Sequence, residues 1–222
     1  MFGKSLEYQV IIVIFYKKKN MLTIGVEINH VIRNVNRQLL KYYQKEFDPS
    51  LDIDELDDRV DVIEKYMKFK SKKEKNNFIY IDYPYEIFGC AGTSENKLAV
   101  KITNWLTSIS NIEEEDIRIV FYSLNEEAIT IQSTFFFLSK IGTRVRKVFF
   151  PRNVKEVWDE CDVVITANNQ MFEEEIPEGK KIVLINRGFN NENKDKAVAN
   201  YDNLSEIIDD DNFLKQFYYE AR

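Results

Sequence analysis

The sequence predicts an α/β fold in which a parallel, Rossmann-like sheet is flanked by helices, and three observations support this. Short apolar runs alternate with helix-like segments, which is the pattern of parallel strands joined by helical crossovers. Several of these runs end in polar residues, as strands do when their carboxyl ends carry a site. The chain has 222 residues, 44% of them apolar. That length is sufficient for one core domain together with an insertion.

Five apolar runs are expected to form the strands, and they lie at residues 22–28, 117–123, 145–150, 162–167 and 181–186. Helical periodicity predicts helices at about residues 33–46, 97–109, 125–141, 153–160 and 203–219. These segments make up the alternating order of a parallel sheet covered by helices.

The helix expected at 125–141 has the clearest pattern. Its predicted buried face is the apolar stripe Ala128, Ile131, Phe135, Leu138 and Ile141. Asn125 suits its N-cap, and Gly142 suits the position just beyond its last turn.

The segment between the first two strands fits the alternation less well. It carries an acidic run, a basic run and an aromatic run, and we interpret the charged runs as solvated surface. We therefore predict an inserted, mainly helical cap at 34–112 and a core domain made of 21–33 and 113–222. Residues 1–20 form an N-terminal extension, whose apolar run is too short to span a bilayer. The alternative is that this extension docks on a neighbouring subunit.

Composition excludes several function classes. The chain carries 37 acidic and 31 basic residues, for a net charge of −6, which argues against direct nucleic-acid binding. Cys90 and Cys161 lie far apart, which favours a reducing compartment such as the cytoplasm. His30 is the only histidine, so a zinc site built on histidines or a Ser/His/Asp triad is not expected. Hydrolysis in this chain would have to depend on carboxylates.

The stretch from Leu22 to Asn34 is the most informative part of the sequence. An apolar run ends in Glu27 and Asn29, and side chains two residues apart on a strand point to the same face. We therefore expect these two side chains to project together from the end of a buried strand.

The order of these features resembles the haloacid dehalogenase-like phosphatases, most closely the 5′(3′)-deoxyribonucleotidase type with its phage-encoded relatives. The resemblance covers about residues 21–190. The family's first motif is Asp-x-Asp-Gly-Val, with a nucleophile followed by an acid/base residue, and these positions hold Glu27, Asn29 and then His30. A doubly wound α/β domain of another kind is the alternative.

The other three motifs of the family are assigned by the same resemblance. Ser123 matches the Ser or Thr that holds the phosphoryl oxygen, and Lys155 matches the phosphate-binding Lys, with Lys147 as second choice. The acidic pair that holds magnesium is replaced by Asn168 and Asn169. The resemblance thus implies a phosphatase site in which three of four carboxylates are replaced by amides.

These replacements are expected to disable the chemistry. The extra methylene of Glu27 moves its carboxylate by about 1.5 Å relative to aspartate. Asn29 cannot exchange a proton, and general acid catalysis is worth roughly 10²–10⁴-fold. His30 is either a loop contact or a substitute acid/base. Since Mg²⁺ prefers carboxylate oxygens, Asn168 and Asn169 are expected not to hold it.

We therefore expect a catalytically degenerate protein that acts as an interaction or structural module, in a bacteriophage virion or a phage-encoded complex. Protein partners or self-association are expected, together with location in the host cytoplasm or the virion, no cofactor and no membrane contact. A small phosphate ligand held by Ser123 and Lys155 is a further possibility. The alternative function is an active Mg²⁺-dependent phosphatase or nucleotidase.

Overall fold

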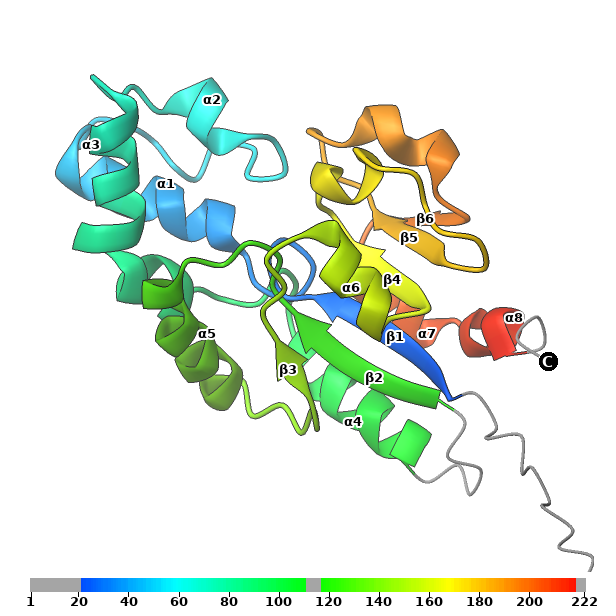
Figure 1. The fold of residues 1–222 in the computed structure, drawn as a ribbon. Helices are drawn as coiled ribbons and strands as arrows, with labels where there is room; N and C mark the ends of the chain where they lie inside the picture. The colour runs from blue at the N-terminus through cyan, green and yellow to red at the C-terminus, as the bar shows by residue number, and fades with distance from the viewer. Residues whose placement is uncertain (1–20, 111–116, 219–222) are drawn as a thin grey trace, which may run out of the picture.

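Six parallel strands form one sheet within residues 21–110 and 117–218, the part of the chain that the computed structural model describes (Figure 1). The strand order is β3-β2-β1-β4-β5-β6. The strands are β1 Leu22–Glu27, β2 Ile117–Tyr122, β3 Val148–Phe149, β4 Val163–Thr166, β5 Lys181–Ile185 and β6 Ala199–Tyr201. The predicted α/β class with a parallel sheet is confirmed. The predicted extension at 1–20 lies outside the described residues.

Helices lie on both faces of the sheet and in a separate cluster beside it (Figure 1). The α-helices are α1 Val35–Glu46, α2 Val62–Tyr66, α3 Lys72–Asn77, α4 Leu98–Ser110, α5 Ala128–Lys140, α6 Val154–Glu160, α7 Leu204–Asp209 and α8 Phe213–Tyr218. Shorter helical turns are η1 Phe78–Asp82, η2 Tyr85–Gly89, η3 Asn169–Phe172 and η4 Asn191–Lys196. Among the described residues, no helix combines the length and apolar character needed to cross a membrane.

Strand β1 lies in the middle of the sheet and its side chains alternate between the two faces. Leu22, Ile24 and Val26 pack in a core shared with α4, α7 and α8. On the opposite face, α6 and η3 pack against β2, β4 and β5. Both faces of β1 are therefore covered, and Glu27 is carried to the buried end of the strand.

Two short helices begin at the same local signal. In α6 the Asn153 side chain accepts from Glu156 N, and Glu156 Oε2 accepts from Arg152 N. In α7 the Asn203 side chain accepts from Glu206 N, and Glu206 Oε2 accepts from Asp202 N. This arrangement is a variant of the capping box in which the Glu accepts from the N–H one residue before the N-cap, and it explains why both helices start where Asn precedes Glu by three residues.

Gly25 permits close packing of α6 against β1. A Cβ at this position would lie 2.6 Å from Cys161 Sγ and 3.3 Å from the Tyr122 ring. We therefore expect Gly25→Ala to lower the free energy of unfolding by about 1–3 kcal/mol, measured by urea denaturation.

The control for this substitution is the same change on a Cys161→Ala background, which removes the nearest atom. There the added methyl group should cost clearly less, because the two residues share one space. An equal cost on both backgrounds would show that the close approach of Cys161 is not the cause.

A third hydrophobic cluster, beside the two on the faces of the sheet, lies within residues 35–88, and we call it the cap cluster. It contains α1, η1 and η2, and its aromatic side chains include Tyr43, Phe78 and Phe88. Helix α4 lies inside the range predicted as cap, 34–112, yet Leu98, Ile102 and Trp105 pack on the sheet. The exact cap boundary stays a prediction, but the side chains of α4 belong to the core cluster.

The structure differs from the sequence prediction at three other elements. Strand β6 was not predicted, because three residues are too few for a periodic signal. The single helix expected at 203–219 is broken into α7 and α8, where the Asp210 side chain accepts from Asn212 N and so forms a turn. In addition, the predicted N-cap of α5 is wrong, and of its predicted apolar stripe only Leu138 is buried.

Helix α5 begins at Ala128, and Asn125 precedes it in a left-handed conformation with φ 54°. There Asn125 Nδ2 donates to Gln170 Oε1 at 3.0 Å, so its side chain bridges two loops instead of capping the helix. The buried side chains of α5 are Thr130, Ser133, Thr134, Phe137 and Leu138, whereas Phe135 is 51% exposed. Gly142 follows the last turn with φ 68°, as predicted.

Candidate functional site

Four of the predicted site residues, Glu27, Asn29, Ser123 and Asn168, lie at or just beyond the carboxyl ends of β1, β2 and β4, three strands that Figure 1 shows side by side. Strand β1 lies in the sheet between β2 and β4, with β2 and β3 on one side of it and β4, β5 and β6 on the other. Loops diverge at such a switch point, and open α/β sheets bind ligands there. The fold therefore places Glu27, Ser123 and Asn168 where a site is expected.

Glu27 is 2% exposed, and both of its carboxylate oxygens accept hydrogen bonds. Oε2 accepts from the Thr166 hydroxyl at 2.5 Å and from Ala167 N at 3.2 Å. Oε1 accepts from Asn168 Nδ2 at 3.2 Å. Burial is the largest effect and raises the pKa of Glu27 from 4.5 to about 7, while these hydrogen bonds act in the opposite direction.

Asn29 is bonded on both sides of its amide. Its Nδ2 donates to Ser123 Oγ at 3.1 Å, and its Oδ1 accepts from Arg33 Nε at 2.9 Å and from Nη2 at 2.5 Å. Ser123 is fully buried. The predicted acid/base position therefore holds an amide whose orientation is fixed by a guanidinium group.

Arg33 is a site residue that the sequence analysis did not identify. Its side chain has no exposed surface, and Nη2 lies 3.5 Å from Glu126 Oε2, which is on a side chain only 2% exposed. Nη1 donates to Phe88 O at 3.1 Å and to Thr134 Oγ1 at 2.6 Å. Burial lowers the pKa of Arg33 to about 10, so it stays charged at neutral pH, and Glu126 opposes that shift.

These contacts make Arg33 a link between three parts of the molecule. Asn29 belongs to the end of β1, Phe88 to the cap cluster, and Thr134 to α5. Hydrogen bonds from Asn34 N to Gly92 O and from Ser94 N to Ile32 O join the two chain segments that connect core and cap cluster. The guanidinium is therefore enclosed at the junction and directed toward Asn29.

His30 adopts a left-handed backbone with φ 63°, at the position where the resemblance implies glycine. Its ring packs edge-on against Phe189 at 5.4 Å between centroids, and its carbonyl accepts from Arg187 Nη2 at 2.6 Å. Burial, followed by the charges of Arg187 and Arg33, lowers the pKa of His30 to about 4. At neutral pH the ring is uncharged, which favours the loop contact over the acid/base alternative.

Lys155 and Asn169 are not brought to this cluster. Lys155 is exposed on α6, and among the described residues it takes part in none of the bonds formed by Glu27, Asn29 and Ser123. Asn169 Nδ2 donates to Phe189 O at 2.7 Å, and its Oδ1 accepts from Asn193 Nδ2 at 2.9 Å. Asn168 alone of the amide pair contacts Glu27.

The residues present do not fit the magnesium ion that the resemblance implies. The oxygens of Glu27 and Asn29 accept protein hydrogen bonds, and Asn168 Oδ1 accepts from Gln170 N at 3.0 Å. Among the described residues, no group of three or more His, Cys, Asp and Glu side chains is placed to hold a metal ion. Mg²⁺ is bound chiefly through carboxylate oxygens and water, and Glu27 is the one carboxylate among Glu27, Asn29, Asn168 and Asn169, so this donor set does not fit the ion.

Two further residues hold the cluster in place. Thr166, at the end of β4, donates to Glu27 and also accepts from Asn168 N at 2.9 Å. Asn190 is fully buried, and its Nδ2 donates to Ala167 O and Ile185 O at 3.0 and 2.9 Å. The sequence analysis did not identify these two residues. The one signal for them was their position at or after the end of a predicted strand, since neither residue belongs to a motif.

Comparisons with known proteins give structural likenesses only. No family model matches the sequence, and no curated protein matches it. A haloacid dehalogenase-like hydrolase from Burkholderia xenovorans LB400 is similar with TM-score 0.51 and 9% identity, over 89% of this chain and 98% of that one. A HAD-superfamily hydrolase of subfamily IA, variant 1, from Geobacter sulfurreducens PCA has TM-score 0.52 and 12% identity, over 85% and 95%.

At these identities the likenesses show the fold and not the activity. They agree with a parallel α/β sheet flanked by helices. The chain has the haloacid dehalogenase-like α/β fold.

Proposed function

We propose that this chain is a catalytically degenerate protein of the haloacid dehalogenase-like fold, acting as a non-enzymatic interaction or structural module. The observation that carries the proposal is the bonding of Asn29. Its amide stands where the family has the acid/base carboxylate. The amide oxygen accepts hydrogen bonds from Arg33, and the amide nitrogen donates one to Ser123. A group without a titratable proton, fixed in this way, cannot serve as general acid.

The state of Glu27 supports the same proposal. Both oxygens are hydrogen-bonded inside the protein, and the pKa of about 7 means that the carboxyl is partly protonated at neutral pH. A nucleophile must be ionised and able to approach the reacting atom in line. The active phosphatase alternative has no comparable observation in its favour.

Exposed apolar side chains support a role in protein contacts. Tyr85 is 46% exposed and Phe136 42%, and their ring centroids lie 5.0 Å apart. Phe135 and Ile129, also on α5, are 51% and 55% exposed. The proposed partners are another protein or a second copy of this chain. The nucleotidase-like, phage-type subfamily and the virion location rest on the sequence resemblance alone.

The enzymatic test is hydrolysis of p-nitrophenyl phosphate and deoxynucleoside monophosphates with magnesium. We expect the wild type to show no turnover above that of Glu27→Gln, which keeps the shape of the side chain and removes the nucleophile. Restoring carboxylates in Glu27→Asp/Asn29→Asp should not create activity, because the new carboxylate at position 29 would face the Arg33 guanidinium and stay ionised.

Wild-type turnover that Glu27→Gln abolishes would reject the pseudoenzyme proposal and favour the phosphatase. Light scattering after size-exclusion chromatography tests the structural role separately. A protein that stays monomeric alone, and that binds no partner, would contradict the interaction module without bearing on catalysis.

A further inference from the structure

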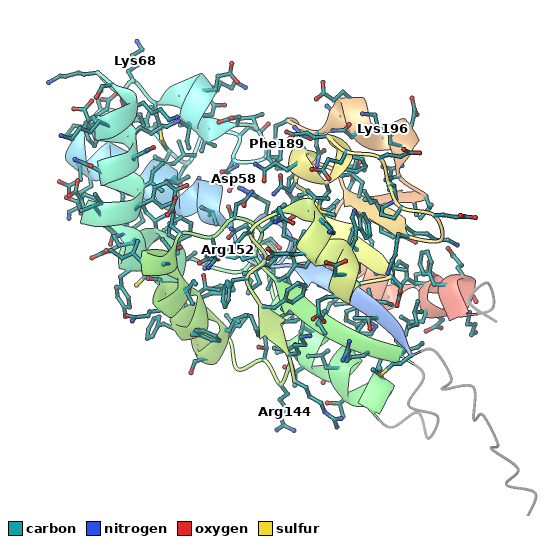
Figure 2. The ribbon with its side chains drawn as sticks, in the orientation of Figure 1. Asp58, Lys68, Arg144, Arg152, Phe189 and Lys196 are labelled. Carbon is teal, nitrogen blue, oxygen red and sulfur yellow. The ribbon has the colours of Figure 1, made fainter. Side chains whose placement is uncertain are left out.

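A group of exposed lysines lies on and between α2 and α3, beside the cap cluster, and Figure 2 shows Lys68 at the outer edge of this region, away from the sheet. We call the group the basic face, and its members are Lys65, Lys68, Lys70, Lys72 and Lys73. Residues 65–75 hold six lysines and one acid, Glu74, although the chain as a whole carries a net charge of −6. Within 21–110 and 117–218, no residue forms an ion pair with the basic face. It is therefore a local excess of positive charge without an internal counter-charge.

The backbone under the basic face is anchored to α1. The Tyr43 hydroxyl accepts from Lys68 N at 2.8 Å and donates to Lys68 O at 3.3 Å. Met67 has extended backbone angles and is buried, and the Phe69 ring packs against Tyr43 with centroids 5.5 Å apart. Burial thus alternates along the segment, and Lys68 and Lys70 are exposed about 7 Å apart, as alternate residues of an extended chain are. Because these attachment points are fixed in advance, a partner loses less entropy on binding them.

Two lysines of the basic face act against local helix stability. Helix α3 begins at Lys72, and its N-cap Ser71 accepts from Glu74 N at 3.1 Å. Lys72 and Lys73 are therefore the first two residues of the helix, where the helix dipole disfavours cations. A solvated surface is the simpler interpretation, but neutral side chains would provide one without this cost. Residues that contradict a local preference without a structural gain indicate a role in binding.

An exposed aromatic ring lies beside these charges. Phe47 is 41% exposed, and its ring stacks on Tyr43 with centroids 5.2 Å apart. The same ring contacts Phe69, between Lys68 and Lys70 in the chain, with centroids 5.5 Å apart. Aromatic rings next to polar groups supply much of the affinity of protein–protein interfaces. This surface therefore offers an apolar contact together with its positive charge.

The charge of the rest of the chain favours a short partner segment over a long polyanion. Of the 31 basic residues, six lie within 65–75, whereas only one of the 37 acidic residues does, so the remainder of the chain is strongly acidic. A nucleic acid or a membrane would extend past the basic face and be repelled by that remainder. Residues 65–75 also contain no arginine, the residue best suited to bidentate contacts with phosphate.

We propose that the basic face binds an acidic segment of a partner protein, with carboxylates beside the lysines and an apolar side chain against Phe47. Complementary charge of this kind directs association and selects the partner. The proposal rests on the proposed function, since it names the class of partner for the interaction module. It uses no residue of the cluster around Glu27.

The test is fluorescence anisotropy with the full chain at neutral pH and low salt. The probe is a labelled decapeptide of alternating Glu and Ala with a central Leu, and its neutral match has Gln in place of Glu. The Glu peptide should bind about tenfold more tightly, as expected for several exposed ion pairs, and the difference should vanish at high salt. Equal binding of the two peptides would overturn the proposal. Tighter binding of an oligothymidylate of equal charge, or of phosphatidylserine vesicles, would overturn it in favour of those polyanions.

A pair of charge-removing variants assigns the binding to the basic face. Lys68→Gln/Lys70→Gln should weaken binding of the Glu peptide about three- to tenfold. The matched control is Arg144→Gln/Arg146→Gln, which removes two exposed charges at the same spacing along the chain. Figure 2 shows Arg144 at the opposite end of the molecule from Lys68, so the control should bind as the wild type does. Equal losses in both variants would show that only net charge matters and would overturn the proposal.

Lys72→Gln/Lys73→Gln separates binding from folding. It should weaken peptide binding to a similar extent while the free energy of unfolding in urea stays equal or rises, because two cations leave the start of α3. A lower free energy of unfolding with unchanged binding would assign the lysines to the fold and contradict the proposal. The hydrolysis assay and the light-scattering test do not involve the basic face. Failure of the peptide to bind would therefore reject this site alone, and Glu27-dependent turnover would reject the proposed function alone.

Discussion

Arg33→Met is expected to lower the free energy of unfolding by about 3–5 kcal/mol, the cost of leaving a buried charge without its partner. Glu126 would be that charge, since its side chain is 2% exposed and its partner Arg33 is fully enclosed. Methionine fills a similar volume but donates no hydrogen bond. Asn29 Oδ1 and Phe88 O would therefore lose their donors as well. Urea denaturation at pH 7 measures the loss.

The double variant Arg33→Met/Glu126→Gln separates the charge from the hydrogen bonds. It should recover a substantial part of the loss, because no buried charge remains, whereas the missing donors to Asn29 and Phe88 keep it below wild type. The matched control is Arg37→Met, whose pair with Asp54 is exposed and should be worth at most about 1 kcal/mol. An Arg33→Met cost as small as that of Arg37→Met would contradict the role assigned to Arg33.

Four of the strands were predictable because each of them has a distinct local signal. Buried parallel strands are continuous apolar runs, and β1, β2, β4 and β5 each show one between polar flanks. Glu27, Ser123 and Asn168 follow such runs, so strand geometry alone brings them to one edge of the sheet. This part of the candidate site follows from chain periodicity and the parallel arrangement.

The buried face of α5 was not predictable from periodicity. The apolar stripe through Phe135 places that ring inward, but the helix turns Thr134 and Phe137 inward and leaves Phe135 half exposed. Thr134 Oγ1 accepts from Arg33, which lies 101 residues earlier in the chain. The buried face of the helix therefore includes a polar contact with a buried arginine, which hydrophobic spacing does not mark, beside the core residues Phe137 and Leu138.

The same contact explains why Arg33 itself was missed. An arginine following a strand and a turn has the sequence signature of an exposed residue. Its burial depends on Glu126 and Phe88 being brought to it by separate segments. Lys155 is the opposite case, since it follows a strand at a suitable spacing and yet is exposed on α6. Residue type and spacing identify strand ends well and side-chain partners poorly.

We expect the unfolding free energy of Glu27→Gln, measured relative to wild type, to depend on pH. The difference should be about 2–3 kcal/mol more in favour of the variant at pH 8 than at pH 5. Burial raises the pKa of Glu27 from 4.5 to about 7, so over that interval the folded state keeps a proton that the unfolded state has lost. Wild-type stability therefore falls as the pH rises through this window, at about 1.4 kcal/mol per unit. Glutamine does not titrate, and its difference from wild type should grow accordingly in urea denaturation at the two pH values.

Thr166→Val provides the matched control, because Thr166 donates to Glu27 Oε2 and this hydrogen bond favours the ionised form. In the wild-type background, Thr166→Val should therefore increase the loss of unfolding free energy between pH 5 and pH 8. In the Glu27→Gln background, Thr166→Val should change the free energy of unfolding by the same amount at both pH values. Adding magnesium chloride to the same denaturation measurements tests whether a metal ion binds at Glu27. If magnesium chloride at pH 8 stabilises the wild type but not Glu27→Gln, a cation binds at this carboxylate, contrary to the hydrogen bonds that occupy both of its oxygens.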